Sequence, residues 1–275
     1  MTLKPYDTEP HPLLHSAFYR FVQLTDLDEV ACWLRNLSLN VLGSILVAPE
    51  GINGVLAGSA QALDEFERAL LGDSRFAGIA FKRSFCTTPP FARMKVHCKS
   101  EIVSIGVPDA GTGCPAGTRI SPQAWRQLMT QDDVVVLDNR NAFEFRLGRF
   151  KSAINPNVEN FRDFPEFVRA QAPGWKAAGQ RVAMYCTGGI RCEKTSAWMH
   201  GLGLDVYELD GGILNYFQAL PDAQREWEGE CFVFDNRIAL DTQLHETSTT
   251  AEQVYADSPD DAWRLMRARR LDAAG

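Results

Sequence analysis

The stretch that most constrains the fold of this chain runs from Arg181 to Gly201 and reads RVAMYCTGGIRCEKTSAWMHG. Its apolar run at 182–185 is typical of a strand buried on both faces of a parallel sheet. A Thr-Gly-Gly turn follows, and residues 191–200 suit a helix that stops at Gly201. Cys186 is therefore predicted at the carboxyl edge of a strand, before a helix N-terminus, where open α/β sheets bind ligands.

Cys186 in such a position is predicted to be a reactive thiolate. Loop amides and a helix N-terminus favour negative charge, so we expect the pKa of the thiol to lie below its free value of about 8.5. A thiolate at neutral pH can attack carbon, carry sulfur or form an adduct. The predicted active-site loop consists of Thr187, Gly188, Gly189, Ile190 and Arg191, the last adding a cation at the rim. The alternative, an inert buried cysteine, would not need this turn behind it.

Strands and helices alternate around this loop, which predicts a parallel sheet with helices on both faces. Strands are expected at 134–137 and 206–209, and helices from Ser121-Pro122 through Met129, over 162–170 and from Gly211-Gly212 through Ala219. The glycine pair is expected to let its loop pass close to Cys186. Strand, CTGGIR loop and helix together resemble a rhodanese active site. The phosphatase loop is one residue longer and encloses a larger oxyanion, which argues against phosphate ester hydrolysis.

Two further groups of residues are expected to support the loop. Asp138, Arg140 and Glu144 follow the strand at 134–137 in a run, LDNRNAFEFRLGRF, that resembles the rhodanese segment beneath the active-site loop. We expect them to form a structural ion-pair network. Cys192 lies in the helix after the loop, and we expect it to pack in the core, since a helical cysteine usually points into the apolar layer. The alternative role for Cys192 is that of a resolving thiol.

The N-terminal part of the chain predicts a second, different domain. Strands at 17–24, 44–48, 53–57 and 79–85 and helices beginning near Asp26 and around Leu63 give the order β-α-β-β-α-β, with a tight turn at PEGING. This order is the ferredoxin-like split βαβ unit. The predicted fold class is therefore α/β, an α+β ferredoxin-like domain followed by a rhodanese-like parallel domain.

The run ARMKVHCKSEIVSIG, which follows, predicts a hairpin that turns near Lys99-Ser100. In its first strand, four residues that can carry positive charge would share one face and could contact an RNA backbone. The alternative is an ordinary solvated strand face. These four residues are Arg93, Lys95, His97 and Lys99.

The predicted domain boundaries follow changes in composition along the 275 residues. We expect a lead-in over 1–14, the ferredoxin-like domain over 15–107, a Gly- and Pro-rich linker over 108–119, the rhodanese-like domain over 120–240, and a flexible segment with a C-terminal helix over 241–275. The run WEGECFVFDNR is predicted to end in a strand with Asp235 and Arg237 exposed after it. The arginines of the C-terminal helix suit its dipole, and an RNA-binding tail is the less favoured alternative.

The net charge, the cysteines and the absence of long apolar runs limit the partners and the cellular location that we expect for this chain. The net charge of −7 gives no global attraction to nucleic acid, so RNA contact would require a local patch. The seven cysteines are scattered and form no CxxC pair, which indicates reduced thiols rather than disulfides or a zinc ribbon. No apolar run is long enough for a bilayer and the N-terminus lacks a signal-peptide pattern, so the expected location is cytoplasmic, with no membrane partner.

The combination of PEGING, MYCTGGIRCEKTSAWM and WEGECFVFDNR resembles one bacterial family, the rhodanese-domain tRNA uridine hydroxylases. These enzymes convert the wobble uridine to 5-hydroxyuridine with molecular oxygen. The resemblance covers roughly residues 15 to 240, and CTGGIRCEK is its specific part. It implies that Cys186 is essential, that tRNA is the partner and that oxygen is the co-substrate. Many members continue into a cysteine-rich C-terminal region, whereas this chain has no cysteine after Cys231 and resembles a short form.

The sequence was next searched for residues that could bind an oxygen-activating metal or cofactor. The five histidines are far apart and seed no iron site, and no flavin or nicotinamide signature is evident, so no cofactor or metal is predicted. One hypothesis is that Cys186 adds to C6 of the pyrimidine and makes C5 electron-rich; a persulfide on Cys186 is the other. Two alternative functions remain, a sulfurtransferase that moves sulfane sulfur from thiosulfate and, less favoured, a non-catalytic binding module.

Overall fold

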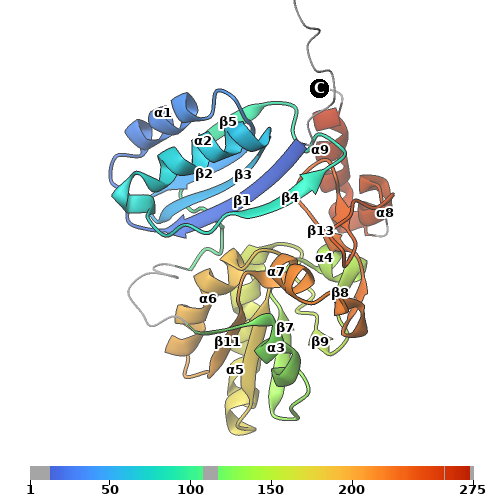
Figure 1. The fold of residues 1–275 in the computed structure, drawn as a ribbon. Coiled ribbons are helices and arrows are strands. Elements are labelled where there is room, and N and C mark those ends of the chain that lie inside the picture. Colours follow the sequence, from blue (N-terminus) through green and yellow to red (C-terminus); the bar gives the residue numbers. More distant parts are fainter. Residues whose placement is uncertain (1–12, 108–116, 257, 273–275) are drawn as a thin grey trace, which may run out of the picture.

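The computed structural model describes residues 13–107, 117–256 and 258–272. Two sheets with their own helices lie one above the other (Figure 1), and the chain passes from the upper to the lower one after β5. The predicted α/β fold class, ferredoxin-like then rhodanese-like, is confirmed. None of the helices in the described ranges is both long and apolar enough to cross a bilayer.

The first domain has the predicted β-α-β-β-α-β order and one added strand. Its sheet runs β4-β1-β3-β2-β5. The central pairs β1·β3 and β2·β3 are antiparallel, and a tight turn at Pro49-Glu50 joins β2 to β3. The elements are β1 (Leu13–Phe21), α1 (Leu27–Leu37), β2 (Leu42–Ala48), β3 (Gly51–Gly58), α2 (Ala60–Leu71), a 3₁₀ turn (Ser74–Phe76), β4 (Lys82–Cys86) and β5 (Met94–Cys98).

Only one face of this sheet is covered by helices of its own domain. Side chains alternate across a strand, so Phe18, Ile45 and Ile52 point to α1 and α2 and form the core with Leu34 and Phe66. The alternate positions of the same strands point the other way, toward the second domain. That open face therefore becomes part of the boundary between the domains (Figure 1).

The predicted hairpin near Lys99-Ser100 is wrong. β5 pairs in parallel with β2, and residues 101–106 form no strand. The backbone N–H of Ile102 donates to the Glu50 carboxylate at 2.8 Å, and Ile105 packs in the core of the second domain. The segment after β5 crosses between domains because its apolar side chains are buried there rather than against β5.

The second domain has a parallel sheet in the order β6-β11-β10-β7-β9. The strands are β6 (Thr118–Ile120), β7 (Val134–Asp138), β9 (Ala153–Ile154), β10 (Arg181–Tyr185) and β11 (Val206–Leu209). The helices are α3 (Pro122–Leu128), α4 (Ala142–Leu147), α5 (Phe164–Ala177), α6 (Ile190–Gly201) and α7 (Gly212–Ala219). Strands at 118–120 and 153–154 were not predicted, since two or three residues carry no periodic signal.

Two predicted elements of this domain differ from the structure. The helix expected over 162–170 continues as α5 to Ala177, because Ala172 and Trp175 bury their side chains in the core and hold the chain helical past Pro173. The run at 227–237 forms two short strands, β12 (Trp227–Gly229) and β13 (Cys231–Phe232), rather than one. They pair with β8 (Gly148–Phe150) and β14 (Ala239–Leu240).

The prediction that Asp235 and Arg237 are exposed is wrong. Their side chains are 4% and 2% exposed and form an ion pair at 2.7 Å. Arg237 also donates to Ser84 of β4 at 3.2 Å. The pair is buried because the loop after β13 lies against the open face of the first sheet, a contact that no local pattern encodes.

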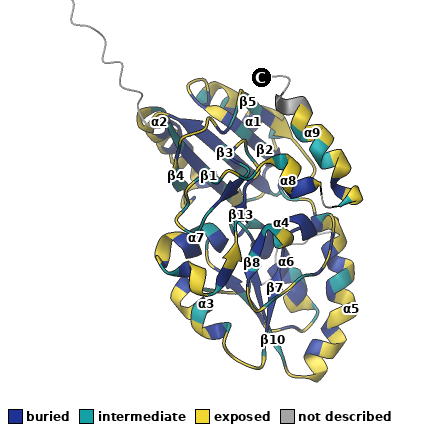
Figure 2. Cartoon of the chain, turned by 90° about the vertical axis from the view of Figure 1, so that its right-hand side faces the viewer, coloured by how far each residue is buried: buried dark blue, intermediate teal, exposed yellow. Residues whose placement is uncertain are grey.

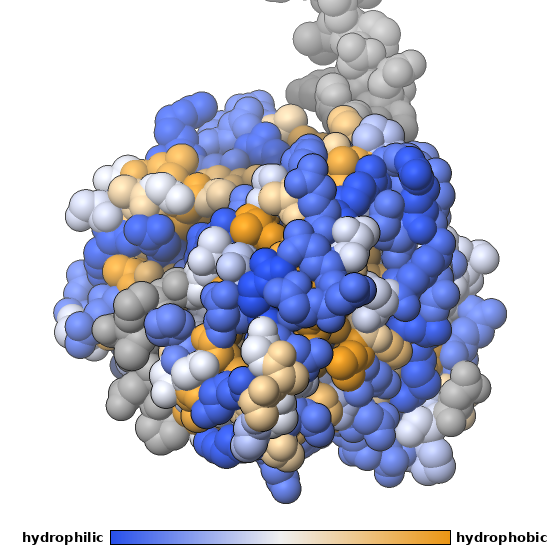
Figure 3. Space-filling model, turned by 90° about the horizontal axis from the view of Figure 1, so that it is seen from below, coloured by the Kyte–Doolittle hydropathy of each residue, from blue (hydrophilic) through white to orange (hydrophobic). Residues whose placement is uncertain are grey.

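The C-terminal residues pack along the side of both domains. Glu246 accepts hydrogen bonds from the backbone N–H of Thr87 at 2.7 Å, which ties residues 241–250 to the first domain. Helices α8 (Ala251–Tyr255) and α9 (Ala262–Asp272) follow, with Arg264 stacked 4.7 Å from the Phe143 ring centroid. In Figure 2 the buried residues line the interior, whereas α9 is largely exposed. From below, the surface is mostly hydrophilic with separate apolar patches (Figure 3).

Candidate active site

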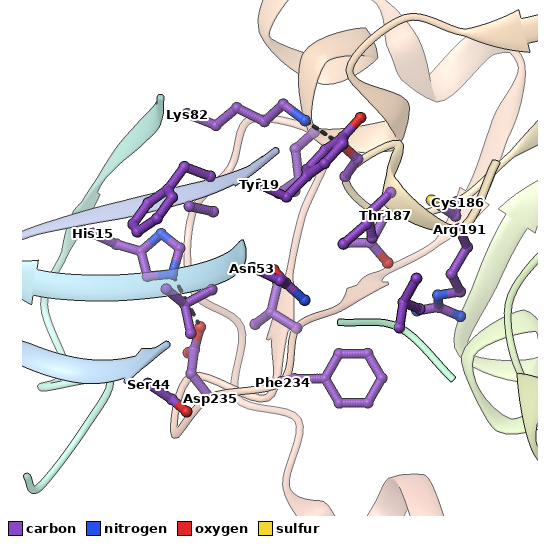
Figure 4. Close-up of a pocket in the computed structure, with 18 of the residues that line it drawn as sticks. His15, Tyr19, Ser44, Asn53, Lys82, Cys186, Thr187, Arg191, Phe234 and Asp235 are labelled. Atoms are coloured by element: carbon purple, nitrogen blue, oxygen red, sulfur yellow. Dashed lines mark hydrogen bonds and ion pairs between the residues drawn. The ribbon is translucent and has the colours of Figure 1, made fainter. Parts of the chain in front are cut away.

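A cavity of about 560 Å³ lies between the open face of the first sheet and the Cys186 loop. Figure 4 shows Tyr19, Asn53 and Lys82 on the side of the first domain and Cys186 opposite them. Phe234, from the loop after β13, closes a third side. The site is therefore built by both domains.

Cys186 follows β10 directly, at the carboxyl edge of the parallel sheet, as predicted. The backbone N–H of Gly189 donates to its sulfur at 3.1 Å, and Gly189 has a φ of +97° as the residue that precedes α6. Burial by itself raises the pKa of the Cys186 thiol. Hydrogen bonds to its sulfur from the side chain and backbone of Cys192, together with the positive charge of Arg191, outweigh burial and lower the pKa to about 6. The expected lowering is confirmed.

The glycine pair after β11 brings a second loop against the first, as predicted. The N–H of Ile213 donates to the carbonyl of Cys186 at 3.0 Å, and that of Leu214 donates to the carbonyl of Thr187 at 3.2 Å. Gly212 has a φ of +69°, and a β-carbon there would lie 2.4 Å from the Cys186 carbonyl oxygen. Only glycine fits this approach.

Arg191 lines the cavity, but it is buried, so the prediction that it lies at the rim is wrong. It is 7% exposed, and its guanidinium forms two hydrogen bonds of 2.8 Å with Glu144, the first-turn carboxylate of α4. Burial raises the pKa of Glu144, but the charge of Arg191 outweighs it and the pKa is lowered. The Arg191 side chain points inward because the buried Glu144 carboxylate needs a counter-charge that solvent cannot supply.

The predicted network of Asp138, Arg140 and Glu144 is divided into two pairs. Arg140 turns back to Asp138 at 2.7 Å, with both side chains fully buried, and Tyr185 donates to Asp138 at 2.6 Å. Glu144 pairs with Arg191 instead. Asp138 and Arg140 support the sheet beneath the loop and do not line the cavity, because the short Asp-Asn-Arg turn directs both away from it.

Cys192 lies in the core, as predicted. It is fully buried in a cluster with Val182, Met184 and Met199. Burial raises the pKa of its thiol well above the ordinary value. The side-chain N–H of Asn139 approaches its sulfur at 3.9 Å.

Several residues that line the cavity come from the first domain and were not predicted. Lys82 donates to the carbonyl of Gly188, inside the Cys186 loop, and burial lowers the pKa of its ammonium. Its Nζ lies 5.4 Å from the centroid of the Tyr19 ring. The sequence did contain a signal for these residues. In the strands of the first domain, polar side chains alternate with apolar ones, and the polar positions mark the sheet face that the helices leave open.

Of the four predicted RNA contacts, Lys95 and His97 lie on β5, at the edge of the first sheet, and Arg93 and Lys99 flank it on either side. Arg93, His97 and Lys99 are exposed and Lys95 is half-buried; none of them lines the cavity. The pairing of β5 with β2 nevertheless places two of these residues on the sheet face that lines the cavity. Lys95 is paired with Ser44 and His97 with Leu46, and paired residues share a sheet face. Since Ser44 and Leu46 line the cavity, Lys95 and His97 continue its face outward.

Lys194 joins the two domains behind the site. It lies on α6, is 2% exposed, and forms an ion pair with Glu50 of the β2–β3 turn and another with Glu101 at 3.1 Å. A buried lysine with two carboxylates holds the helix after Cys186 to the first sheet. Among the residues that the structure describes, no three His, Cys, Asp or Glu side chains come together as a metal site.

Comparisons with known proteins agree with this architecture. Residues 14–102 match the UPF0176 acylphosphatase-like domain, and residues 121–219 match the rhodanese-like domain. A tRNA uridine(34) hydroxylase of Synechococcus elongatus is 49% identical over 230 residues, 82% of this chain and 85% of that protein. One of Legionella pneumophila is 40% identical over 252 residues, 90% of this chain and 96% of that protein. The chain belongs to the tRNA uridine(34) hydroxylase family.

Proposed function

We propose that this protein hydroxylates the wobble uridine of tRNA to 5-hydroxyuridine, with molecular oxygen as co-substrate and Cys186 as the reacting side chain. The observation that carries the proposal is the position of Cys186, whose thiol has a pKa of about 6 and lines a cavity that a second domain completes. A thiolate there is ionised at neutral pH.

Each neighbour of Cys186 has a proposed role in this reaction. The loop from Thr187 to Ile190 supplies amides that stabilise negative charge on sulfur. Arg191, fixed by Glu144, adds a positive charge close to the thiolate without reaching solvent. Asp138 and Arg140 hold the strand end in place, and Cys192 serves as a packing residue rather than a resolving thiol.

The partner in this proposal is tRNA, and the reaction takes place in the cytoplasm. The basic edge formed by β5, with Arg93, Lys95, His97 and Lys99, would contact the RNA backbone. Exposed Arg267 of α9 lines the cavity mouth and adds another positive charge. Backbone contacts of this kind give affinity, while the cavity selects the base.

For the chemical step, the proposal is that the Cys186 thiolate adds to C6 of uracil. The new sulfur–carbon bond uses the thiolate electron pair, and the C5–C6 π electrons move to C5, in conjugation with the C4 carbonyl. C5 becomes the electron-rich carbon that oxygen chemistry requires. A persulfide on Cys186 is the competing hypothesis; a covalent protein–RNA species with the wild type, absent in Cys186→Ser, would favour addition.

Nucleoside analysis of tRNA tests the function. A deletion strain is expected to lose 5-hydroxyuridine-derived nucleosides, to regain them with the wild-type gene, and to remain deficient with Cys186→Ser. The second candidate, a thiosulfate sulfurtransferase, is favoured only by the six-residue loop from Cys186 to Arg191. Unchanged tRNA together with robust thiosulfate:cyanide activity would select it.

A further inference from the structure

We infer that Asn53 and Phe234 form the base-binding subsite of the cavity, in which Asn53 reads the Watson–Crick edge of uracil and Phe234 stacks on its ring. This inference rests on the proposed function and deepens it, because it assigns base selection to two residues outside the rhodanese loop. In Figure 4 the Asn53 amide points into the cavity, with Thr187 on one side of it and Phe234 on the other.

The orientation of the Asn53 amide is determined by its neighbour. Nδ2 of Asn53 donates to the carbonyl oxygen of Ile102 at 3.2 Å. A carbonyl oxygen can only accept, so the atom beside it must be the nitrogen of the amide. Oδ1 and the second N–H of Nδ2 remain for a ligand. The Asn53 amide therefore presents one acceptor next to one donor to the cavity, and their order is fixed.

This order matches uracil and opposes cytosine. Uracil offers the N3–H donor beside the O4 acceptor, which pair with Oδ1 and Nδ2–H respectively. Cytosine carries an acceptor at N3 and an amino donor at C4. It matches the same amide only with the ring turned over, which moves N1 and the attached ribose and so disfavours binding of the RNA loop, and which also presents the opposite face of the ring to residue 186. A side-chain amide that cannot rotate thus discriminates between the two pyrimidines.

The position of Asn53 is linked to that of Cys186. Ile102, which holds the Asn53 amide, is itself held through its N–H by Glu50 at 2.8 Å. Glu50 pairs in turn with buried Lys194 on α6, the helix that begins at the end of the Cys186 loop. Asn53 is thereby held at a set distance from the sulfur, as base recognition beside a reacting atom requires.

Phe234 supplies the flat surface that a base needs. The residue is 59% exposed, although most of the large apolar residues that the structure describes are buried. It forms a T-shaped pair with the Phe232 ring at 4.9 Å between centroids, and the guanidinium of Arg191 lies 5.7 Å from the Phe234 ring centroid. An exposed aromatic ring, held rigidly at a cavity that must receive an extruded base, serves as a stacking platform.

Equilibrium binding of anticodon stem-loop RNAs with uridine or cytidine at the wobble position tests the assignment. All proteins carry Cys186→Ser, so that no covalent step contributes. Asn53→Ala is expected to reduce the preference for the uridine loop by about tenfold. Asn53→Asp, nearly the same size but without the N–H donor, is expected to shift the preference in the same direction. Asn36→Ala, on exposed α1 behind the sheet, serves as the control.

Phe234→Ala has a different expected signature. Stacking is tolerant of base identity, so affinity for both loops should fall about tenfold while their ratio stays the same. Phe85→Ala removes a ring that is 71% exposed but lies outside the cavity, and should change neither value. Thermal unfolding of each variant reports whether it is folded.

An unchanged uridine preference in folded Asn53→Ala and Asn53→Asp would overturn the role of Asn53. Unchanged affinity in Phe234→Ala would overturn the role of Phe234. A parent protein that binds neither loop would contradict the proposed function itself, and the subsite with it. Binding without preference in the parent would overturn the base-reading subsite alone.

Discussion

The backbone N–H of Gly189 points at the sulfur of Cys186 and donates to it across 3.1 Å. Gly189 can do so because it adopts a left-handed φ of +97° at the start of α6, a conformation that residues with a β-carbon rarely adopt. The charge on the sulfur is thus stabilised by the fold of the loop, with Arg191 close behind it.

The ionisation of Cys186 can be measured directly. Alkylation by iodoacetamide should follow the thiolate fraction, with a midpoint near pH 6, since the pKa of Cys186 is lowered to about 6. The rate should level off above pH 7. Mass spectrometry of the Cys186 peptide separates this reaction from that of exposed Cys32 and Cys98. A midpoint near the ordinary value of a cysteine would contradict the proposed role of the loop.

Gly212→Ala should destabilise the protein and abolish activity. Its new β-carbon would meet the Cys186 carbonyl oxygen at 2.4 Å, in addition to the strain at a φ of +69°. Gly179→Ala is the matched control, because its φ is +65° and nothing lies within 4 Å of the added carbon. We expect Gly179→Ala to cost about 1 kcal/mol and Gly212→Ala at least about 2 kcal/mol more, measured by urea unfolding. Equal losses would rule out the steric argument.

Glu144→Gln should lower the free energy of unfolding by about 3–5 kcal/mol, because it leaves Arg191 buried without a counter-charge. Asp133→Asn breaks an ion pair of similar length with Arg181, but Asp133 is exposed, so the change should be much smaller. Urea unfolding at neutral pH compares the two. A small loss in Glu144→Gln would show that Arg191 finds solvent or another partner.

Lys95→Ala should weaken tRNA binding. It should also reduce the slope of log affinity against log salt concentration by about 1, as expected for one lost phosphate contact. Arg68→Ala on α2 removes an exposed cation from the helix-covered side of the same sheet and should leave the slope unchanged. Titrations at several salt concentrations distinguish the two. If both variants behave alike, the β5 edge is only a solvated surface.

His15 should make stability depend on pH. Its pKa is lowered from 6.5 to about 4, chiefly by burial and next by Arg237, so the unfolded chain binds a proton between these values that the folded protein does not. Stability should therefore fall as the pH drops from 7 toward 4, by up to about 3 kcal/mol from this residue. His15→Gln should lose this component, and exposed His200→Gln should retain it. Identical pH profiles for wild type and His15→Gln would contradict the shift.

Local patterns were sufficient for the elements that make the loop. The strand before Cys186, the glycine turn, the helix after it and the glycine pair of α7 were all predicted, because each depends on residues close in sequence. The β-α-β-β-α-β order of the first domain was predicted for the same reason. Apolar periodicity and turn residues act within a few positions of one another.

The partners of the charged residues could be decided only by the tertiary structure. Arg191 turns inward to Glu144, Asp235 and Arg237 are buried against the first sheet, and β5 joins β2 in parallel rather than forming a hairpin. Each of these outcomes depends on packing between segments that are distant in sequence, within a domain for Arg191 and β5 and between the domains for Asp235 and Arg237. A sequence shows which residues can carry charge, but the desolvation and pairing that determine where a charge is stable arise only when distant segments pack together.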